Sequence, residues 1–323
     1  MLNAALAGLG WWGRTIDRLL AGSRKLRVVR RVDPMVREAG VDTDLQQALR
    51  DPTVQAVILC TPHTLHTQQI VQAANAGKHV FCEKPLSLSR SDVLSAIEAV
   101  NANKVVLGVG HEKRFEPPIQ EVFRLVQSGA LGKPLQVEAN FSQDKFLSLP
   151  ADNWRLSAKE APAGPMTATG IHLLDLSVGL LGPAEHVYAR VRQLGSQLTN
   201  GDTLGILVGF RNGGNALISA VLATPFDGRF AVYGSKGWAE VRDKAHPESP
   251  RGWTLTISLR GEEKRSSEYP VAQAVLANLE AFADAAGGGA PYPVPQEQMV
   301  ANVSALEAIF RSASSGKVEE VAA

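Results

Sequence analysis

Apolar residues in the first third of the chain follow two alternating patterns, short unbroken runs and longer stretches with helical spacing. Unbroken runs are typical of buried parallel strands, and the spaced pattern is typical of the helices that cover them. The expected strands lie at residues 4–7, 54–60, 78–82 and 105–109, and the expected helices at 14–20, 67–76 and 91–102. This alternation predicts an α/β fold with a doubly wound parallel sheet, which is the Rossmann arrangement.

The pattern changes after Pro117-Pro118. Residues 187–259 contain stretches in which apolar and polar residues alternate, as in strands with one buried face. Asn212-Gly213 is a strong signal for a hairpin between two of these strands. Helices are expected at 119–127, 171–181, 271–286 and 296–312, a further strand at 135–141, and a frayed tail beyond Lys317. The second half is therefore expected to be an α+β domain with an open-faced, largely antiparallel sheet.

Length and charge narrow the possible organisation and partners. A chain of 323 residues exceeds what one hydrophobic core usually serves, so we expect two domains, residues 1–116 and 117–323. A formal net charge of +1 gives no electrostatic support for binding nucleic acid or an acidic membrane. No stretch approaches the length of a membrane span, and the N-terminus lacks the pattern of a signal peptide.

The cysteines and two closely spaced histidines do not predict a metal site. Cys60 and Cys82 both fall in expected buried strands, so they are interpreted as reduced core residues of a cytoplasmic protein. His63 and His66 have a spacing found in metal sites, but no matching cysteine or carboxylate pattern accompanies them. We expect them instead to line a cofactor cleft, together with Thr61 and Pro62.

The stretch 8–13, Gly-Leu-Gly-Trp-Trp-Gly, stands between the first expected strand and the first expected helix. In this context, Gly8 permits a tight turn, Gly10 lets the backbone approach a pyrophosphate, and Gly13 lets the helix pack close to the strand. Asp33 follows Gly13 by twenty residues, the spacing of a carboxylate that binds the adenosine ribose diol. Because a carboxylate there would repel a 2′-phosphate, NAD is favoured over NADP.

Glu83-Lys84-Pro85 stands at the carboxyl end of the strand expected at 78–82, the edge where open α/β sheets bind ligands. Successive side chains along a strand point to opposite sides, so Glu83 and Lys84 cannot both face one ligand. Pro85 restricts the backbone of Lys84. A lysine beside a bound nicotinamide could exchange the proton of a substrate hydroxyl, whereas the alternative is a solvated loop lysine.

Several short motifs resemble those of the glucose–fructose oxidoreductase, inositol dehydrogenase and MocA family. They are the glycine stretch ending in Trp12-Gly13, Thr61-Pro62 followed by His66, the run 76–80, Glu83-Lys84-Pro85, Trp154-Arg155, the run 170–175, and Tyr292-Pro293-Val294. The resemblance covers nearly the whole chain. It implies a Rossmann domain followed by an open-faced sheet domain, with the cofactor cleft between them, and NAD(P)-dependent oxidation or reduction of a sugar, polyol or related carbonyl.

The resemblance also implies roles for particular residues. The catalytic lysine of the family falls on Lys84, whose bond to Pro85 is often cis in relatives, and its histidine falls on His172. The cofactor-binding residues expected from the motifs are Gly8, Leu9, Gly10, Trp11, Trp12, Gly13, Asp33, Thr61, Pro62, His63, His66, Glu83 and Lys84.

One position departs from the family pattern. The family usually carries an aspartate four residues before its histidine, and this chain has Ala168 there. On an ideal helix, Ala168, His172 and Asp175 lie on one face within about 60°. A buried His–Asp pair needs mutual hydrogen bonds or a ligand-lined cleft, so Asp175 either binds a hydroxyl or positions its neighbours. Either Lys84 and His172 suffice for catalysis, another group substitutes, or the chemistry has changed.

Four further residues are candidate substrate contacts beside His172 and Asp175. His111 and Arg114 follow the strand expected at 105–109, at the same sheet edge as Lys84, although a surface role is equally open. Trp154 and Arg155 could offer an apolar face and a cation to a sugar or carboxylate, or could pack at a domain interface. His79, His186 and His246 are interpreted as structural or solvated.

These observations predict an NAD-dependent oxidoreductase that transfers a hydride between nicotinamide and a sugar, polyol or related cyclic alcohol or ketone. Ala168 keeps two alternatives open: a non-catalytic NAD-dependent sensor on the same fold, and a redox-neutral NAD-dependent glycosidase. The open sheet face needs cover, so we expect a homodimer or homotetramer formed through strands in the region 187–259.

Overall fold

The computed structural model describes residues 1–322, and they form two compact units. The first comprises residues 1–112 and 273–303, and the second comprises 113–272 and the segment from 304 onward. The division expected from the sequence, at residues 116 and 117, assigned 273–303 to the second domain. That segment instead packs on the N-terminal sheet, because helix α7 (Ala274–Ala286) buries Leu279 and Phe282 there.

The first unit contains a six-stranded, wholly parallel sheet. Its strands are β1 (Leu2–Ala7), β2 (Leu26–Val32), β3 (Val41–Asp42), β4 (Ala56–Leu59), β5 (His79–Cys82) and β6 (Leu107–Val109). They lie in the order β3-β2-β1-β4-β5-β6, and every pair is parallel. This is the strand order of a Rossmann fold, and the order reverses between β1 and β4. The expected doubly wound sheet is confirmed.

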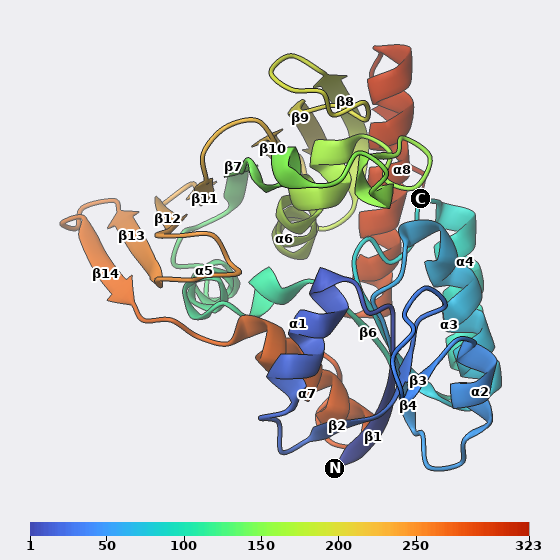
Figure 1. Ribbon diagram of the computed structural model, residues 1–323. Helices are drawn as coiled ribbons and strands as arrows, with labels where there is room; N and C mark the ends of the chain where they lie inside the picture. Colours follow the sequence, from blue (N-terminus) through green and yellow to red (C-terminus); the bar gives the residue numbers. More distant parts are fainter. Residues whose placement is uncertain (323) are drawn as a thin grey trace. The chain divides into compact units, whose positions relative to one another are not determined.

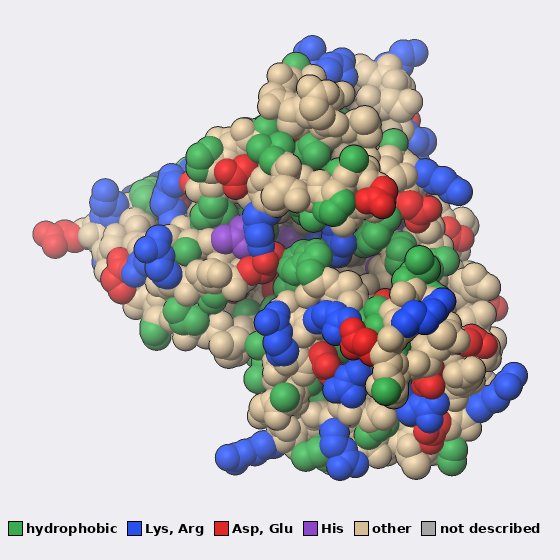
Figure 2. All heavy atoms as spheres, viewed as in Figure 1, with side chains coloured by type: hydrophobic (Ala, Val, Ile, Leu, Met, Phe, Trp, Pro, Cys, Tyr) green, Lys and Arg blue, Asp and Glu red, His purple; other side chains and the backbone are tan. Residues whose placement is uncertain are grey.

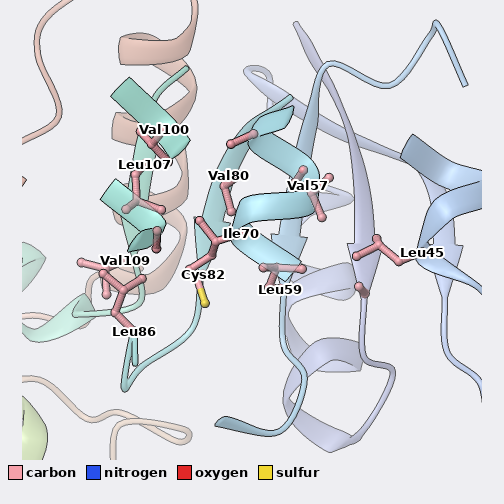
Figure 3. Close-up of a cluster of buried hydrophobic side chains, with 14 of the residues drawn as sticks. Leu45, Val57, Leu59, Ile70, Val80, Cys82, Leu86, Val100, Leu107 and Val109 are labelled. Carbon is pink, nitrogen blue, oxygen red and sulfur yellow. The ribbon is translucent and has the colours of Figure 1, made fainter. Parts of the chain in front are cut away.

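Both faces of this sheet are covered by helices, as its unbroken apolar strands require (Figure 1). The helices are α1 (Trp11–Leu20), α2 (Leu45–Arg50), α3 (His66–Asn75) and α4 (Arg90–Ala102), together with α7 and the first part of α8 (Gln296–Ser315). Val57, Leu59 and Val80 pack with Ile70 of α3 in one core, which Figure 3 shows. The alternate strand residues, such as Ile58 and Phe81, pack with α1 and α7 in the other.

Two polar side chains fasten the returning segment to the end of β6. The Tyr292 hydroxyl and the Asn278 amide both donate to the carbonyl of Val109, at 2.9 Å each, and the N–H of Val109 donates to the Tyr292 oxygen at 3.1 Å. The same Tyr292 hydroxyl lies 2.6 Å from the side-chain oxygen of Asn278, so its single proton is shared between that oxygen and the Val109 carbonyl. The short motif Tyr292-Pro293-Val294 is therefore part of the first unit.

The second unit contains a nine-stranded sheet in the order β14-β13-β12-β11-β7-β10-β9-β8-β15. The strands are β7 (Pro134–Ser142), β8 (Ala184–Arg192), β9 (Thr203–Phe210), β10 (Asn215–Val221), β11 (Asp227–Gly234), β12 (Gly237–Asp243), β13 (Trp253–Leu259), β14 (Arg265–Tyr269) and β15 (Glu319–Glu320). Only β7 and β10 pair in parallel. The expected antiparallel character is confirmed, as is the hairpin at Asn212-Gly213 between β9 and β10.

Helix α6 (Ile171–Leu181) packs against β7 and β10, and α5 (Pro117–Gln127) packs against β12 and β13. The inward residues of β10, such as Ile218, are buried, whereas Leu217 between them is 43% exposed. Leu217 lies opposite Leu207, which lies opposite Tyr188, and these two are 42% and 39% exposed. One face of the sheet therefore carries a row of partly exposed apolar side chains.

The chain end differs from the sequence-based expectation. The tail beyond Lys317 was expected to fray, but Glu319 and Glu320 pair with Val187 and His186 of β8. Val321 is 8% exposed, and its N–H donates to Glu185. The expectation of fraying was therefore wrong. A strand of two residues is too short to produce a periodic pattern of apolar positions, so the sequence could not reveal it.

Neither Cys60 nor Cys82 forms a disulfide. On the face seen in Figure 2, lysine and arginine side chains are interspersed with aspartate and glutamate. None of the helices in residues 1–322 combines the length and apolar character that crossing a bilayer would need.

Candidate functional site

The glycine loop between β1 and α1 has the shape that a pyrophosphate needs. Gly8 has φ +89°, and a Cβ on Gly13 would lie 1.9 Å from the carbonyl oxygen of Gly8. Helix α1 can therefore approach the end of β1 only because residue 13 lacks a side chain. At Gly10, by contrast, a Cβ would meet no atom within 4 Å. That open space lies at the helix N-terminus, where N–H groups lack intrahelical partners and favour an anion.

Asp33 connects the end of β2 to this loop. Its carboxylate accepts hydrogen bonds from the N–H of Leu9 at 2.7 Å and from the N–H of Met35 at 2.8 Å. An ionised carboxylate has about four lone-pair positions, so two remain for other donors. Asp33 thus fixes the glycine loop and retains the capacity to bind a ribose diol.

A cavity of about 190 Å³ lies beside the point where the strand order reverses. Its lining includes Gly8 from the end of β1, Pro34 after β2, and Thr61, Leu65 and Gln69 after β4. The Thr61 hydroxyl donates to the side-chain oxygen of Gln69 at 2.5 Å. Position and lining suit a flat heterocycle such as adenine. Pro34, Leu65 and Gln69 were missed from the sequence, and their only signal is that they follow two strand ends.

Glu83 and Lys84 follow the end of β5 and differ in burial. Glu83 is 7% exposed, and a Cβ on Gly110 would lie 2.5 Å from its carboxylate oxygen, so this carboxylate packs against the end of β6. Lys84 is half-buried, and its bond to Pro85 is cis. Glu83 is thus placed among protein groups, whereas Lys84 is partly accessible.

His66 begins α3 and is completely buried. Its Nδ1 lies 2.8 Å from the carbonyl oxygen of Pro85, and its Nε2 lies 2.9 Å from the carbonyl oxygen of Thr61. Burial lowers the pKa of His66, and the two carbonyl oxygens oppose this shift. Both ring nitrogens contact backbone, so His66 bridges two loops, whereas the sequence suggested that it lines the cofactor cleft.

The remaining expected cofactor residues of the first unit differ in environment. Leu9 is buried, and Trp11 is 41% exposed with its ring 5.3 Å from that of Trp12. Trp12 packs on the core that α1 shares with α7. His63 is buried, and its ring lies 5.8 Å from that of His66. The half-buried Pro62 lies between Thr61 and His63, and the buried His111 follows β6.

In the second unit, His172 lies in the first turn of α6 and is 4% exposed. Its ring centroid lies 6.2 Å from that of Phe141 on β7. The residues just before it, Met166–Gly170, form a π-helical turn that a calculation for a regular helix does not anticipate. The expected placement of Ala168 and His172 on one helix face assumed a regular α-helix, with about 100° between successive residues. A π turn is wider than an α-helical turn, so the angle between these two residues differs from the expected one.

The threonines beside Ala168 do not supply the absent carboxylate. The Thr167 hydroxyl donates to the carbonyl of Gly164 at 3.3 Å, and the Thr169 hydroxyl donates to that of Pro165 at 3.2 Å. Both hydroxyls therefore stabilise the π turn. Ala168 itself is half-buried.

Arg114 and Asp175, two expected substrate contacts, bind each other. The guanidinium donates to both carboxylate oxygens of Asp175, at 2.6 and 2.8 Å, and to its backbone carbonyl at 3.0 Å. Their side chains are 8% and 2% exposed. This bidentate pair fastens α6 to the segment before α5, which supports the positioning alternative for Asp175. Trp154 and Arg155 also pair with each other, the guanidinium lying 4.3 Å from the centre of the indole ring.

A buried polar cluster in the same unit was not expected from the sequence. Lys113, 5% exposed, donates to Glu116 and to Asp243 at 3.2 Å each, and Asp243 also accepts from the indole N–H of Trp253 at 3.0 Å. The ammonium lies 5.2 Å from the centre of the Phe141 ring. Burial opposes the charge, but Asp243 and Glu116 raise the pKa of Lys113 well above its usual range. Lys113 is therefore a permanent cation.

His246 is half-buried beside this cluster, which supports a structural role over the solvated alternative. Its Nε2 lies 2.5 Å from the side-chain oxygen of Gln143, and its Nδ1 accepts from the N–H of Glu248 at 3.2 Å. Burial, with Lys145 and Lys113 nearby, lowers the pKa of His246 to about 4. The ring is neutral at pH 7 and holds the loop between β12 and β13.

Comparison with known protein families agrees with the folds of the two units. Residues 2–111 match the family described as "Oxidoreductase family, NAD-binding Rossmann fold", and residues 119–240 match the "GFO/IDH/MocA C-terminal domain". Together the two matched segments cover more than half of the chain.

Among curated proteins, the chain is 28% identical to 1,5-anhydro-D-fructose reductase of Ensifer adhaerens, over 86% of this chain and 83% of that protein. It is 31% identical to myo-inositol 2-dehydrogenase of Thermotoga maritima, over 64% of this chain and 63% of that protein. Several of the relatives are matched over less than two thirds of their own length. Among solved structures, aldose-aldose oxidoreductase from Caulobacter crescentus superposes with a TM-score of 0.85 at 25% identity, and 99% of each chain is covered.

Proposed function

The chain belongs to the GFO/IDH/MocA family of oxidoreductases, and on that premise we propose that it transfers a hydride between NAD and a carbinol or carbonyl carbon of a sugar, polyol or related cyclic substrate. The observation that carries the proposal is the glycine loop. Its open space at Gly10, its close approach at Gly13 and its bond to Asp33 suit a dinucleotide. The relatives named above act on sugars and inositol according to their names, which supports the substrate class.

Each part of the first unit has a defined task in this proposal. The N-terminal N–H groups of α1 bind the pyrophosphate, and Asp33 accepts hydrogen bonds from the adenosine ribose. The carboxylate would repel a 2′-phosphate, which favours NAD. The bound nicotinamide supplies the hydride acceptor or donor. Lys84 takes the hydroxyl proton as the carbinol is oxidised, or returns it in the reverse direction.

His172 is proposed to hydrogen-bond the reacting oxygen. Its burial and its place at the start of α6 give the ring a fixed direction. Where the family usually has an aspartate, Ala168 provides no carboxylate, so the proton transfer rests on Lys84 and His172.

Replacement of Lys84 by methionine tests the proposal. Lys84→Met should lower kcat about 10²- to 10⁴-fold, the usual contribution of a general acid–base group, and leave NADH affinity unchanged. Lys25→Met, which removes a surface lysine paired with Asp284, is the matched control. The assay follows NADH absorbance over a panel of cyclic polyols and aldoses, with NAD and NADP compared. Undiminished turnover by Lys84→Met would refute the assigned role.

Ala168 favours one second candidate, an NAD-dependent sensor without turnover. In that case NADH binds, as measured by quenching of tryptophan fluorescence, but no member of the panel is oxidised or reduced. Sugar binding would then be detectable by calorimetry. Release of a leaving group without net NADH would instead indicate the redox-neutral glycosidase.

The row of Tyr188, Leu207 and Leu217 on the open sheet face supports a proposal about assembly. We propose that a second copy of the chain covers this face, because contiguous exposed apolar side chains on a sheet typically mark an interface.

A further inference from the structure

The loops that follow β4 and β5 are joined through one buried side chain. His66 contacts the carbonyl oxygen of Thr61 in the first loop at 2.9 Å and that of Pro85 in the second at 2.8 Å. The ring is completely buried and belongs to the first residue of α3, so its position is fixed by the helix and the core beneath it. We infer that His66 is a positioning residue that holds Lys84 in place relative to the loop that follows β4.

The chemistry of the two contacts defines how the bridge works. A neutral imidazole has one N–H donor, and both neighbours of His66 are acceptors, so the neutral ring donates to one loop and an imidazolium donates to both. The groups that act on the ring are the two carbonyls and the edge of the His63 ring, 5.8 Å away. In either protonation state, the ring restrains the backbone of at least one loop.

The restrained segments are those that the proposed function uses. Thr61 lines the cavity at the reversal of strand order, and Pro85 directly follows Lys84. Because Lys84 extends from the end of a four-residue strand, the direction of its side chain depends on the backbone at residues 84 and 85. Misplacing a catalytic group by about 1 Å costs up to about 10²-fold in rate. The inference rests on the proposed role of Lys84.

The first test is hydrogen–deuterium exchange of the unliganded protein. In His66→Phe, the amides of Lys84, Leu86 and Ser87 should exchange about five- to tenfold faster than in wild type, the effect of losing a single hydrogen bond. His66→Gln retains an amide donor and should exchange at an intermediate rate. His79→Gln is the matched control, because His79 is a half-buried histidine of the same unit that accepts from the N–H of Val106, the residue just before β6.

The second test measures the reactivity of Lys84 itself. The extent of Lys84 acetylation by acetic anhydride is measured by mass spectrometry as a function of pH. The midpoint of this pH profile should shift in His66→Phe and should shift less in His66→Gln. Loss of turnover should appear in kcat more than in NADH affinity.

Unchanged exchange at residues 84–87 in His66→Phe would overturn the inference, whatever the kinetics. So would equal effects of the phenylalanine and glutamine variants, since a purely structural cavity effect does not depend on a donor. If the phenylalanine variant does not fold, the glutamine variant alone decides by the same exchange measurement. Full activity of Lys84→Met would refute the proposed function and leave the exchange result standing.

Discussion

At the residue scale, two glycines of one loop have separable roles. Gly13 is required by packing, because a Cβ there would overlap the Gly8 carbonyl oxygen, whereas Gly10 borders open space. Adding a methyl group at residue 13 therefore tests the packing of the protein. Adding one at residue 10 tests whether a ligand occupies the space there.

Gly13→Ala should destabilise the protein by about 1–3 kcal/mol, the usual cost of overpacking, and weaken NADH binding as well. The free energy of unfolding in urea and a fluorescence titration with NADH measure the two effects.

Gly10→Ala is the counterpart. It should change stability by less than about 1 kcal/mol, the difference between glycine and alanine at a helix N-cap, but still weaken NADH binding. Normal NADH affinity in Gly10→Ala would mean that no pyrophosphate approaches this position.

Residues whose place follows from local spacing could be predicted from the sequence better than residues whose role depends on a distant partner. The glycines, Asp33 and the strand-end positions follow from local spacing, and the structure gives the Asp33 carboxylate an unanticipated bond to Leu9. Arg114 and Asp175 were both named, but not as partners, because sixty-one positions separate them and pairing at that distance depends on the fold. The roles of Lys84 and His172 stay predictions.

At the element scale, α6 is held by an ion pair at its middle and a π turn at its start. Arg114 and Asp175 are buried, so removing one charge leaves the other unpaired in a low dielectric.

Asp175→Asn should therefore destabilise the protein by about 3–5 kcal/mol. Thermal unfolding followed by circular dichroism measures the loss. The control is Glu121→Gln, which breaks a more exposed pair with Arg124 in the same unit and should leave the unfolding temperature nearly unchanged. Equal stability of the two variants would contradict the buried role.

The loop between β8 and β9 depends on the charge of Asp202. Burial raises its pKa, but hydrogen bonds to the carboxylate prevail and lower the pKa of Asp202 to about 2. The donors are the N–H groups of Leu194 and Gly195 and the hydroxyls of Ser196 and Thr203.

Because the folded pKa lies below the unfolded value of about 3.8, this stabilisation is present above pH 4 and is lost as the pH falls from about 4 to about 2. The shift corresponds to about 2 kcal/mol. Asp202→Asn should flatten the pH dependence of the unfolding free energy in that window. A wild-type slope in the variant would assign the acid sensitivity to other groups.

Hydrophobic periodicity found most of the longer elements, and their bounds differ by a few residues from those expected. It missed β2, β3 and α2 of the first unit, although β2 has seven residues. It also missed the π turn at Met166–Gly170 and the short strand β15, because neither is long enough to create a period. It also could not show that α7 covers the N-terminal sheet, since an apolar helix face does not identify the sheet on which it packs.

At the scale of the whole molecule, the open sheet face is the feature with a measurable consequence. Leu217→Glu places a charge in the middle of the row formed with Leu207 and Tyr188. It should convert the expected dimer or tetramer into a smaller species, as measured by light scattering at micromolar concentration. Thr256→Glu, on the same sheet but outside the row, is the control. A wild-type protein that is monomeric would exclude this interface.

The discontinuity of the first unit affects how the chain is made. The 160 residues from 113 to 272 are translated before the segment that completes the N-terminal core. At about 5–20 residues per second, the ribosome needs about 8–32 s to reach it. Throughout that interval, the apolar side chains that Phe282 and Leu279 cover in the folded unit lack this cover. The core of the first unit can therefore be completed only after the second unit has been translated.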